Sequence, residues 1–424
     1  MAQRFYVETL GCPKNQVDSE KLIGTLLADG MTATDDASKA DLVVVNTCAF
    51  IDEARRESID TILALEEQRK KGARIVVTGC MAERYGSELA EALPEVDQVA
   101  GFGVPVNLMA KPGRTSIPVS AAALPSLDLL NLPRPKATAP WAYVKIAEGC
   151  DRNCGFCAIP SFRGPQRSRD IAAVLAEVEQ LGAQEIVLVA QDLASYGKDR
   201  PDELGAGAIV SLVKAVSAMS PWTRLLYLYP SDLTDELVDA ILQTKVPYFD
   251  LSLQHVSKPL LRRMRRWGDG QRFLDRIADI RRLEPSAAFR SNFIVGYPGE
   301  TEADHDQLLA FVEEAQLDWC GFFAYSAEDG THAATLDGQV PESLMHERLA
   351  ELRELQDNIT AERSDATIGN TIEVLVDASG EARSTREAPE IDGVIEVPTS
   401  LAVGAFHTVR VVDAMGPDRV AESL

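Results

Sequence analysis

The pattern of hydrophobic and polar positions in residues 1–110 is typical of a parallel α/β domain. Short apolar runs alternate there with amphipathic stretches, and each run is followed by a helical pattern. The expected strands are RFYVET, DLVVVN and RIVVT, and the expected helices include residues 20–28 and 53–70. The repeat of strand and helix predicts a parallel sheet of buried strands.

The middle of the chain is expected to hold a linker followed by a partial barrel. Residues 111–140 contain six prolines and no sustained apolar periodicity, which predicts an extended linker. Strand and helix patterns alternate again over residues 141–340. Six strands are expected there: WAYVKIA, EIVLVA, RLLYLY, YFDLSL, AFRSNFIV and DWCGFFAY. Six βα units predict a partial barrel, because a full barrel of this kind needs eight.

The last part of the chain predicts a connecting helix and a small β domain. Residues 341–365 have the pattern of a polar amphipathic helix. Residues 366–424 contain the strand patterns TIEVLV, GVIEVP and HTVRVVD, separated by turn residues. The expected fold class is therefore α/β, with an N-terminal parallel α/β domain, a central partial (β/α)6 barrel and a small antiparallel β-barrel at the C-terminal end.

Composition and charge narrow the class of protein. Of the 424 residues, 46% are hydrophobic and 25% are charged, as in ordinary soluble globular proteins. No apolar run approaches the roughly 20 residues that cross a bilayer, and the N-terminus lacks the features of a secretory signal. We therefore expect a cytoplasmic protein without a membrane partner. The formal net charge of −23 disfavours non-specific attraction to nucleic acid.

Three early cysteines stand at equivalent places in the predicted sheet. Cys12, Cys48 and Cys80 each come directly where an expected strand ends and a helix begins. The carboxyl ends of parallel strands line one crevice, so these cysteines could meet in space. Helix N-termini at that edge favour the thiolate, and a reducing compartment favours metal ligands over disulfides. The alternative is three small buried residues in a core.

A second group of cysteines directly follows the first expected barrel strand, in EGCDRNCGFCAIP. Cys150, Cys154 and Cys157 form a C-x3-C-x2-C motif, with Phe156 before the last cysteine. Three thiolates cannot complete a tetrahedral zinc site without a fourth ligand from elsewhere. They can hold three irons of a four-iron cluster and leave the fourth iron open, for instance to S-adenosylmethionine (SAM). Cleavage of SAM at such an iron gives a radical that takes hydrogen from an unactivated carbon.

This motif, placed at the end of the first strand of an incomplete barrel, resembles the radical SAM superfamily. A resemblance to the methylthiotransferases covers nearly the whole chain. It rests on LGCPKNQVDSE, NTCAF, TGC, KIAEGCDRNCGFCAIPSFRGPQRSR, LSLQH, FIVGYPGET and the terminal β domain, which corresponds to a TRAM domain in that family.

The resemblance implies two [4Fe–4S] clusters. Cys150, Cys154 and Cys157 would bind the SAM cluster, and Cys12, Cys48 and Cys80 an auxiliary cluster. It also implies the course of the reaction: the radical removes a hydrogen from the substrate, a sulfur held at the auxiliary cluster bonds to that carbon, and a second SAM supplies the methyl group. A flavodoxin-like or equivalent reductant is implied as the electron source.

The substrate is suggested by a narrower resemblance. QDLASYGKD, LYLYP and RSTREAPEIDG are similar to the members that modify the β-carbon of an aspartate in small-subunit ribosomal protein twelve. Residues 360–424 hold twelve acidic residues and five arginines, a net charge of −7 that suits a basic protein better than an RNA backbone. The alternatives are a tRNA adenosine methylthiotransferase and a non-enzymatic iron–sulfur or zinc-bearing interaction protein.

Contacts to SAM are expected at the carboxyl ends of the barrel strands. The candidates there are Gln191, Asp192, Gln254 and Asn292, and Phe156 is expected near the adenine. Each polar candidate has the alternative of a satisfied group at a strand end. The reaction requires no side-chain general base, so no catalytic residue is assigned.

Two other features have ordinary structural interpretations. Four arginines between residues 260 and 267, at positions 262, 263, 265 and 266, are expected on a solvated helix face, with nucleic-acid contact as the alternative. His255, at a strand end, is expected to be a structural hydrogen-bonding histidine.

Overall fold

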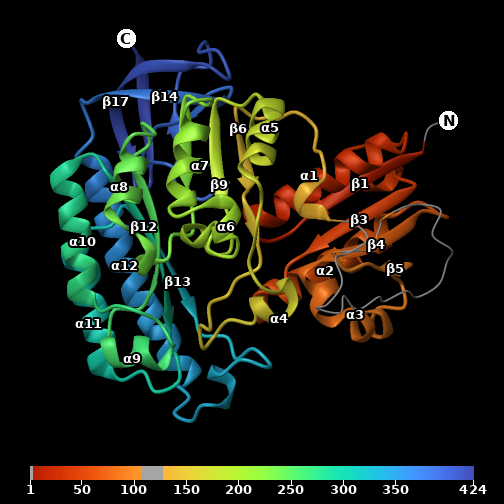
Figure 1. The fold of residues 1–424 in the computed structure, drawn as a ribbon, viewed down its shortest axis with the longest axis horizontal. Helices are drawn as coiled ribbons and strands as arrows, with labels where there is room; N and C mark the ends of the chain where they lie inside the picture. Colours follow the sequence, from red (N-terminus) through yellow and green to blue (C-terminus); the bar gives the residue numbers. More distant parts are fainter. Residues whose placement is uncertain (1–2, 103, 105, 107–127) are drawn as a thin grey trace. The chain divides into compact units, whose positions relative to one another are not determined.

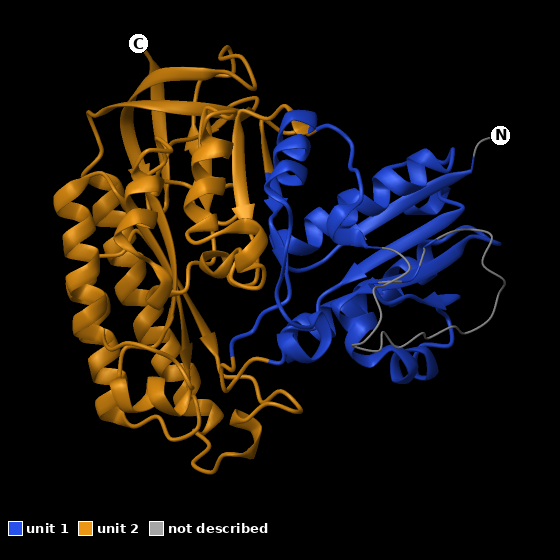
Figure 2. Ribbon diagram, in the orientation of Figure 1, with its two compact units in different colours: residues 1–136, 143–152, 158–180 blue, residues 137–142, 153–157, 181–424 orange. Residues whose placement is uncertain are grey.

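The computed structural model describes residues 3–102, 104, 106 and 128–424. The chain forms two compact units, which Figure 2 shows in different colours. The first comprises residues 1–136, 143–152 and 158–180, and the second residues 137–142, 153–157 and 181–424. The expected linker at 111–140 lies largely outside the described residues. No helix in the described part of the chain is long and apolar enough to cross a membrane.

The first unit is built on a five-stranded parallel sheet in the order β2-β1-β3-β4-β5 (Figure 1). Its strands are β1 (Arg4–Thr9), β2 (Thr32–Ala33), β3 (Leu42–Thr47), β4 (Arg74–Gly79) and β5 (Gln98–Val99). The three longer strands are the expected ones. The two edge strands were missed because two residues are too few to show a periodicity.

Helices cover both faces of this sheet. They are α1 (Pro13–Ala28), α2 (Asp52–Gln68) and α3 (Cys80–Ala92). Val43 and Val45 pack with residues of α2 and α3, whereas Val44 packs with residues of α1. Successive side chains of a strand point to opposite faces, so an apolar run such as DLVVVN fills two cores at once. The parallel sheet of buried strands is confirmed.

The first unit also contains most of the start of the central domain. Its elements are β6 (Trp141–Lys145), β7 (Ala147–Glu148), α4 (Ile159–Arg163), β8 (Arg167–Ser168) and α5 (Ile171–Leu181), of which residues 141, 142 and 181 belong to the second unit. A buried carboxylate fastens α5 to the elements around it. Glu177 in α5 forms ion pairs with Lys21, Arg134 and Arg169. A buried charge is tolerated when it has such partners, so this cluster fixes α5 against α1.

The second unit contains the other five strands expected for the barrel. They are β9 (Glu185–Val189), β10 (Trp222–Leu225), β11 (Tyr248–Gln254), β12 (Ala288–Val295) and β13 (Trp319–Ala324). Strands β9 and β10 pair in parallel, as do β11, β12 and β13. A bridge between Leu228 and Leu251 joins the two sets. With β6, all six expected strands are present.

The helices of the second unit lie on one side of its sheet. The longer ones are α7 (Ala208–Ser217), α8 (Asp235–Leu242), α10 (Gly270–Leu283), α11 (Glu302–Ala315) and α12 (Glu342–Asp365), and the shorter ones are α6 (Pro201–Leu204) and α9 (Lys258–Arg263). Phe293 of β12 packs edge-on against Phe311 of α11. Because side chains alternate along a strand, Arg290 and Asn292 of β12 point to the opposite, helix-free face.

The C-terminal domain is a closed barrel in the order β14-β15-β16-β18-β17. Its strands are β14 (Thr371–Ala378), β15 (Glu381–Arg383), β16 (Ile395–Glu396), β17 (Phe406–Met415) and β18 (Asp418–Ser423). Val374, Val376, Ile395 and Val409 fill its interior. The expected small β-barrel is confirmed, although one pair, β16 with β18, is parallel.

The C-terminal barrel docks on the amino ends of the second unit's strands. Glu185, at the start of β9, accepts hydrogen bonds from Arg224 and from Arg383 of β15, both at 2.7 Å. Tyr248, at the start of β11, donates to Asp392 Oδ2 at 2.6 Å. The amino ends are therefore closed by buried polar contacts. These contacts do not involve the carboxyl ends of the strands, where the active sites of such folds lie.

Candidate functional site

The three early cysteines lie at the carboxyl ends of neighbouring strands. Cys12 is the N-cap of α1 after β1, Cys48 directly follows β3, and Cys80 begins α3 after β4. Strand β3 pairs with both β1 and β4, so its cysteine lies between the other two strand ends. The prediction that these cysteines share one edge of the sheet agrees with this topology.

Two glycines allow the close approach of these strand ends. Gly11 precedes Cys12, and a Cβ placed on it would lie 2.9 Å from Cys48 Sγ. Gly79 precedes Cys80, and a Cβ there would lie 2.5 Å from the carbonyl oxygen of Thr47. Both have φ near +90°, which side chains rarely adopt. The letters GC, which occur in both LGC and TGC, therefore reflect a packing requirement.

The three thiols differ in acidity. Burial alone would raise the pKa of Cys12, but the charges of Lys14 and Arg163 lower it below its ordinary value. Burial, followed by the proximity of Cys80 and Cys12, raises the pKa of Cys48 to about 12. Burial also raises the pKa of Cys80. The expected preference for thiolate thus holds only for Cys12, and a bound metal would have to deprotonate the other two thiols.

A buried ionic group lies beside Cys80. Arg163, the last residue of α4, donates from Nη2 to Cys80 Sγ at 3.0 Å. Its Nη1 donates to Asp18 and Glu148, at 3.1 Å and 3.0 Å. Lys145 in turn pairs with both of these carboxylates. The charges are balanced in pairs, which offsets the cost of burying them.

The C-x3-C-x2-C motif begins in the first unit. The backbone N–H of Cys150 donates to the carbonyl oxygen of Gly164 at 3.1 Å. Gly149, with φ of 77°, lies so close to the following loop that a Cβ would come within 2.1 Å of the carbonyl oxygen of Pro165. This is the third glycine that directly precedes a candidate cysteine and has no room for a side chain.

The motif continues in the second unit, where hydrogen bonds fix its loop. The N–H of Gly155 donates to the carbonyl oxygen of Met264 at 2.8 Å, and its carbonyl accepts from Ala333 at 2.7 Å. Arg266 Nη1 donates to Cys154 Sγ at 3.2 Å. Arg266 also donates to the carbonyl of Ser252 and lies over the ring of Tyr229.

The surroundings of Arg266 correct the interpretation of the arginine run. Arg262 and Arg265 are exposed, as a solvated helix face requires. Arg266 is 9% exposed and hydrogen-bonds a cysteine of the motif, so for this residue the expected solvated face is wrong. Its role depends on a contact across 112 residues of sequence, which the local charge pattern does not reveal.

The donor set fits an iron–sulfur cluster. Each group of candidate ligands consists of thiols alone, and one thiol in each group accepts a hydrogen bond from a buried arginine. Thiolates are the ligands that such clusters use, and hydrogen bonds to their sulfurs tune them. Among the residues described, no three His, Cys, Asp or Glu side chains are grouped closely enough to hold one metal ion. In a cluster each thiolate binds a separate iron.

The residues expected to contact SAM have different environments. Gln254 and Asn292 lie half-buried on adjacent strands, β11 and β12, and Asn292 Oδ1 is buried without a hydrogen-bond partner. Gln191 is half-buried just after β9. Asp192 is buried, and its Oδ2 accepts a hydrogen bond from Ser195 Oγ at 2.7 Å. Phe156 is half-buried in the motif loop.

His255 is the structural histidine that the sequence predicted. Its ring is completely buried, and Nδ1 accepts from the N–H of Ser257 at 3.1 Å. Burial lowers the pKa of His255 to about 4, so the ring is neutral near pH 7.

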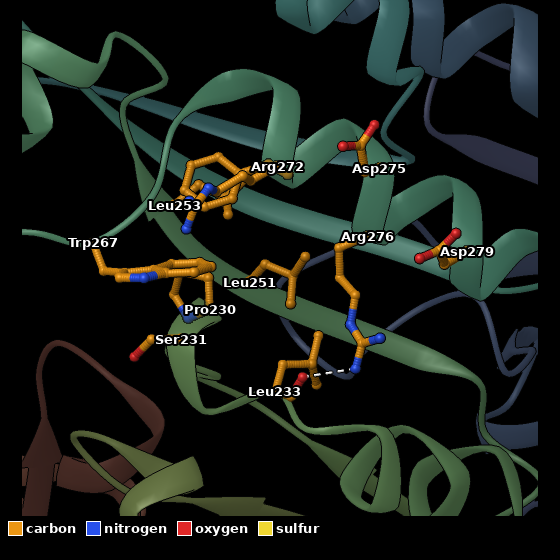
Figure 3. Close-up of a pocket in the computed structure, with 11 residues that line it drawn as sticks. Pro230, Ser231, Leu233, Leu251, Leu253, Trp267, Arg272, Asp275, Arg276 and Asp279 are labelled. Atoms are coloured by element: carbon orange, nitrogen blue, oxygen red, sulfur yellow. Dashed lines mark hydrogen bonds between the residues drawn. The ribbon is translucent and has the colours of Figure 1, made fainter.

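A cavity of about 310 Å³ lies on the helix-covered face of β11, away from the candidate residues. Leu251 and Leu253 of β11 both line it. Figure 3 shows the remaining side chains around it, with Arg276 bonded to the carbonyl of Leu233 at 2.7 Å. Neither Gln254 nor Asn292 is among the residues that line this hollow.

The sequence did not identify Arg163 and Arg266, which donate hydrogen bonds to cysteines, or Asn15, which lies beside Cys80. Asn15 Nδ2 donates to the carbonyls of Leu10 and Thr47, and thereby ties the ends of β1 and β3 together. The sequence signal for these residues was present only as letters inside the family motifs, LGCPKN and SFRGPQRSR. Nothing in their periodicity or spacing distinguishes them from surface residues.

Comparison with known proteins assigns each part of the chain. Residues 4–101 match the model of the uncharacterized protein family UPF0004, residues 144–312 the radical SAM superfamily, and residues 368–423 the TRAM domain. A solved structure of the radical S-adenosylmethionine methyltransferase TsrM from Kitasatospora setae aligns with a TM-score of 0.50 at 15% identity. It covers 76% of this chain and 73% of that one. This likeness shows the fold.

Fold and motif together place the chain among the radical SAM enzymes. Two relatives are each named ribosomal protein uS12 methylthiotransferase RimO. The one from Kineococcus radiotolerans is 41% identical over 98% of this chain and 96% of its own length, and the one from Anaeromyxobacter sp. (strain K) is 42% identical over 99% and 93%. The chain belongs to the family of these uS12 methylthiotransferases.

Proposed function

We propose that this protein is a methylthiotransferase that inserts sulfur and a methyl group at the β-carbon of an aspartate in small-subunit ribosomal protein uS12. The observation that carries the proposal is the convergence of three cysteines from separate strand ends, in a chain that also has the C-x3-C-x2-C motif. Membership of the family supports the same activity.

The proposal assigns two iron–sulfur clusters. Cys150, Cys154 and Cys157 would hold the cluster that binds SAM. Cys12, Cys48 and Cys80 would hold an auxiliary [4Fe–4S] cluster from which sulfur is delivered. When bound, the two clusters and SAM would together supply a radical that can take hydrogen from an unactivated carbon, the sulfur that replaces this hydrogen, and an electrophilic methyl group.

The chain's own residues bind and orient in this scheme. Arg266 donates a hydrogen bond to Cys154 Sγ, and the bonds of Gly155 to Met264 and Ala333 fix the loop between the ligands. Gln254 and Asn292 offer polar groups near the carboxyl ends of β11 and β12, and the buried Asn292 Oδ1 without a partner suits a ligand that donates a hydrogen bond. Phe156, Gln191 and Asp192 are the other proposed SAM contacts.

The charge of the C-terminal domain supports a basic protein substrate. All five arginines of residues 360–424 are engaged in ion pairs, so they are not available as a row of phosphate contacts. The pairs are Arg363–Asp318, Arg383–Glu185, Arg386–Asp318, Arg410–Glu422 and Arg419–Glu387. Most of the acidic residues of this domain remain to attract a basic partner. A flavodoxin-like or equivalent one-electron reductant completes the proposal.

The proposal is tested by supplying both kinds of substrate to the same protein. The reconstituted, reduced protein is incubated anaerobically with SAM and either unmodified small ribosomal subunits or unmodified tRNA, and both products are analysed by mass spectrometry. We expect one methylthio group on uS12 and none on tRNA. Subunits whose target aspartate is replaced by asparagine serve as the control and should gain nothing.

Two results would contradict the proposal in different ways. Methylthiolation of tRNA alone would overturn the substrate and keep the chemistry. A fully loaded protein that cleaves no SAM with either substrate would overturn the enzyme activity itself.

A further inference from the structure

Arg163 is a buried arginine whose guanidinium reaches the early cysteines. Its side chain is 3% exposed, and Nη2 lies 3.0 Å from Cys80 Sγ. A guanidinium keeps its charge at any accessible pH and has no acceptor atom. Arg163 is therefore a permanent donor directed at one thiol of the group.

The plane of this guanidinium is fixed by contacts on every side. On one edge Nη1 donates to Asp18 and Glu148, and on the other Nη2 donates to Asn15 Oδ1 at 2.7 Å. The ring of Phe102 lies 4.2 Å from its central carbon. Such bidentate and stacked contacts need the flat, forked shape of arginine, which lysine lacks.

The contact of Arg163 is the shorter of two polar contacts at Cys80 Sγ. Arg163 Nη2 lies 3.0 Å from this sulfur, whereas Asn15 Oδ1 lies 3.5 Å from it. Hydrogen bonds from a charged donor such as a guanidinium are stronger than those between neutral groups.

We propose that Arg163 is a positioning residue that hydrogen-bonds Cys80 as a ligand of the auxiliary cluster, and that its charge makes this cluster easier to reduce. The inference rests on the proposed function, because it needs a second cluster on Cys12, Cys48 and Cys80. Its physical basis is general: a cation and a hydrogen bond at a cluster sulfur stabilise the more negative, reduced state.

The test uses protein that holds the auxiliary cluster alone. The parent carries Cys150→Ala, Cys154→Ala and Cys157→Ala, and Arg163→Gln or Arg163→Lys is added to it. Each protein is reconstituted anaerobically and titrated with reductant, and the reduced fraction is followed by electron paramagnetic resonance.

We expect Arg163→Gln to lower the ratio of reduced to oxidised cluster at least tenfold at the parent's midpoint, which corresponds to a shift of about 59 mV for one electron. Arg163→Lys keeps the positive charge but loses the planar, forked guanidinium. In this variant the ratio of reduced to oxidised cluster should therefore fall less. Arg69→Gln is the control, because Arg69 is a half-buried arginine of the same unit that pairs with Asp97 beside the amino end of β4. Its ratio should equal the parent's.

The outcomes separate this inference from the proposed function. A parent without any cluster would overturn the second cluster and with it the proposed function. A parent with a cluster, and a ratio in Arg163→Gln equal to that in Arg69→Gln, would overturn only the role of Arg163. If Arg163→Gln fails to take up iron, Arg163→Lys decides: an unchanged ratio in that variant contradicts the inference.

Discussion

The two ends of the strands in the second unit carry opposite kinds of polar contact. At the amino ends, charged residues are buried against partners from the C-terminal barrel, as in the pairing of Glu185 with Arg383. At the carboxyl ends, the side chains of Gln191, Gln254 and Asn292 are half-buried, and Asn292 Oδ1 has no hydrogen-bond partner. Satisfied buried groups stabilise a fold, whereas unsatisfied ones cost free energy unless a ligand completes them. We infer that the contacts at the amino ends stabilise the unit, and that the carboxyl ends bind ligands and carry out the reaction.

The largest effect is expected from breaking the ionic group at the amino ends. Glu185→Gln leaves Arg224 and Arg383 buried without their shared carboxylate, which should cost about 3–5 kcal/mol in the free energy of unfolding. Urea unfolding of the full chain measures this loss. The control Glu422→Gln breaks the exposed pair with Arg410 and should cost less than about 1 kcal/mol. If both variants lost the same free energy of unfolding, the buried ion pairs of Glu185 would contribute no more to stability than the exposed pair of Glu422.

A smaller effect, dependent on pH, is expected from Asp392. Burial raises the pKa of this carboxyl from 3.8 to about 6. The folded state thus binds the proton more tightly, so the stabilisation is complete below about pH 4 and is lost as the pH rises through 6. The loss amounts to about 3 kcal/mol, and Asp392→Asn should remove this part of the pH dependence.

Tyr248→Phe sharpens the test of Asp392. Tyr248 donates a hydrogen bond to this carboxylate, which favours its charged form. Its removal should move the pH-dependent loss to higher pH. Identical pH profiles of unfolding for the wild type and Asp392→Asn would contradict this account.

The smallest effect in free energy is expected from a change at the carboxyl ends of the strands. It should appear as a lower rate of SAM cleavage. Arg266→Gln removes the hydrogen bond to Cys154 Sγ, and the loss of a contact that orients a metal ligand typically costs ten- to a hundredfold. SAM cleavage per folded molecule should fall by about this factor. Arg262→Gln, on the same run but exposed, is the control and should leave the rate unchanged. Equal rates in the two variants would show that Arg266 only packs.

Much of this organisation could be predicted from the sequence because the informative patterns are local. DLVVVN and RIVVT identify their strands by composition, and the cysteines of the motif lie within eight residues. The strand-end position of Cys12, Cys48 and Cys80 follows from the order of strand and helix alone. The short strands β2, β5 and β15 and the longer strand β18 were missed, because their pairing is decided by neighbours in space.

The contacts that support the cysteines could not be predicted from local patterns. Arg163 and Cys80 are 83 residues apart, and Arg266 and Cys154 are 112 residues apart. The periodicity of each segment gives no sign of these partners. The same limit explains why Arg266 was expected in solvent, since four arginines in eight residues have the composition of an exposed helix.

The central claim is that the two groups of cysteines hold separate clusters with separate tasks. The most direct test compares two triple variants, one with Cys12, Cys48 and Cys80 changed to Ala and one with Cys150, Cys154 and Cys157 changed to Ala. Bound iron, SAM cleavage and methylthiolation of uS12 are measured in each. We predict that each variant loses about half of the iron. Only the first should still cleave SAM, and neither should modify uS12. If the first variant keeps all the iron of the wild type, or still modifies uS12, the assignment of a second cluster to Cys12, Cys48 and Cys80 is wrong.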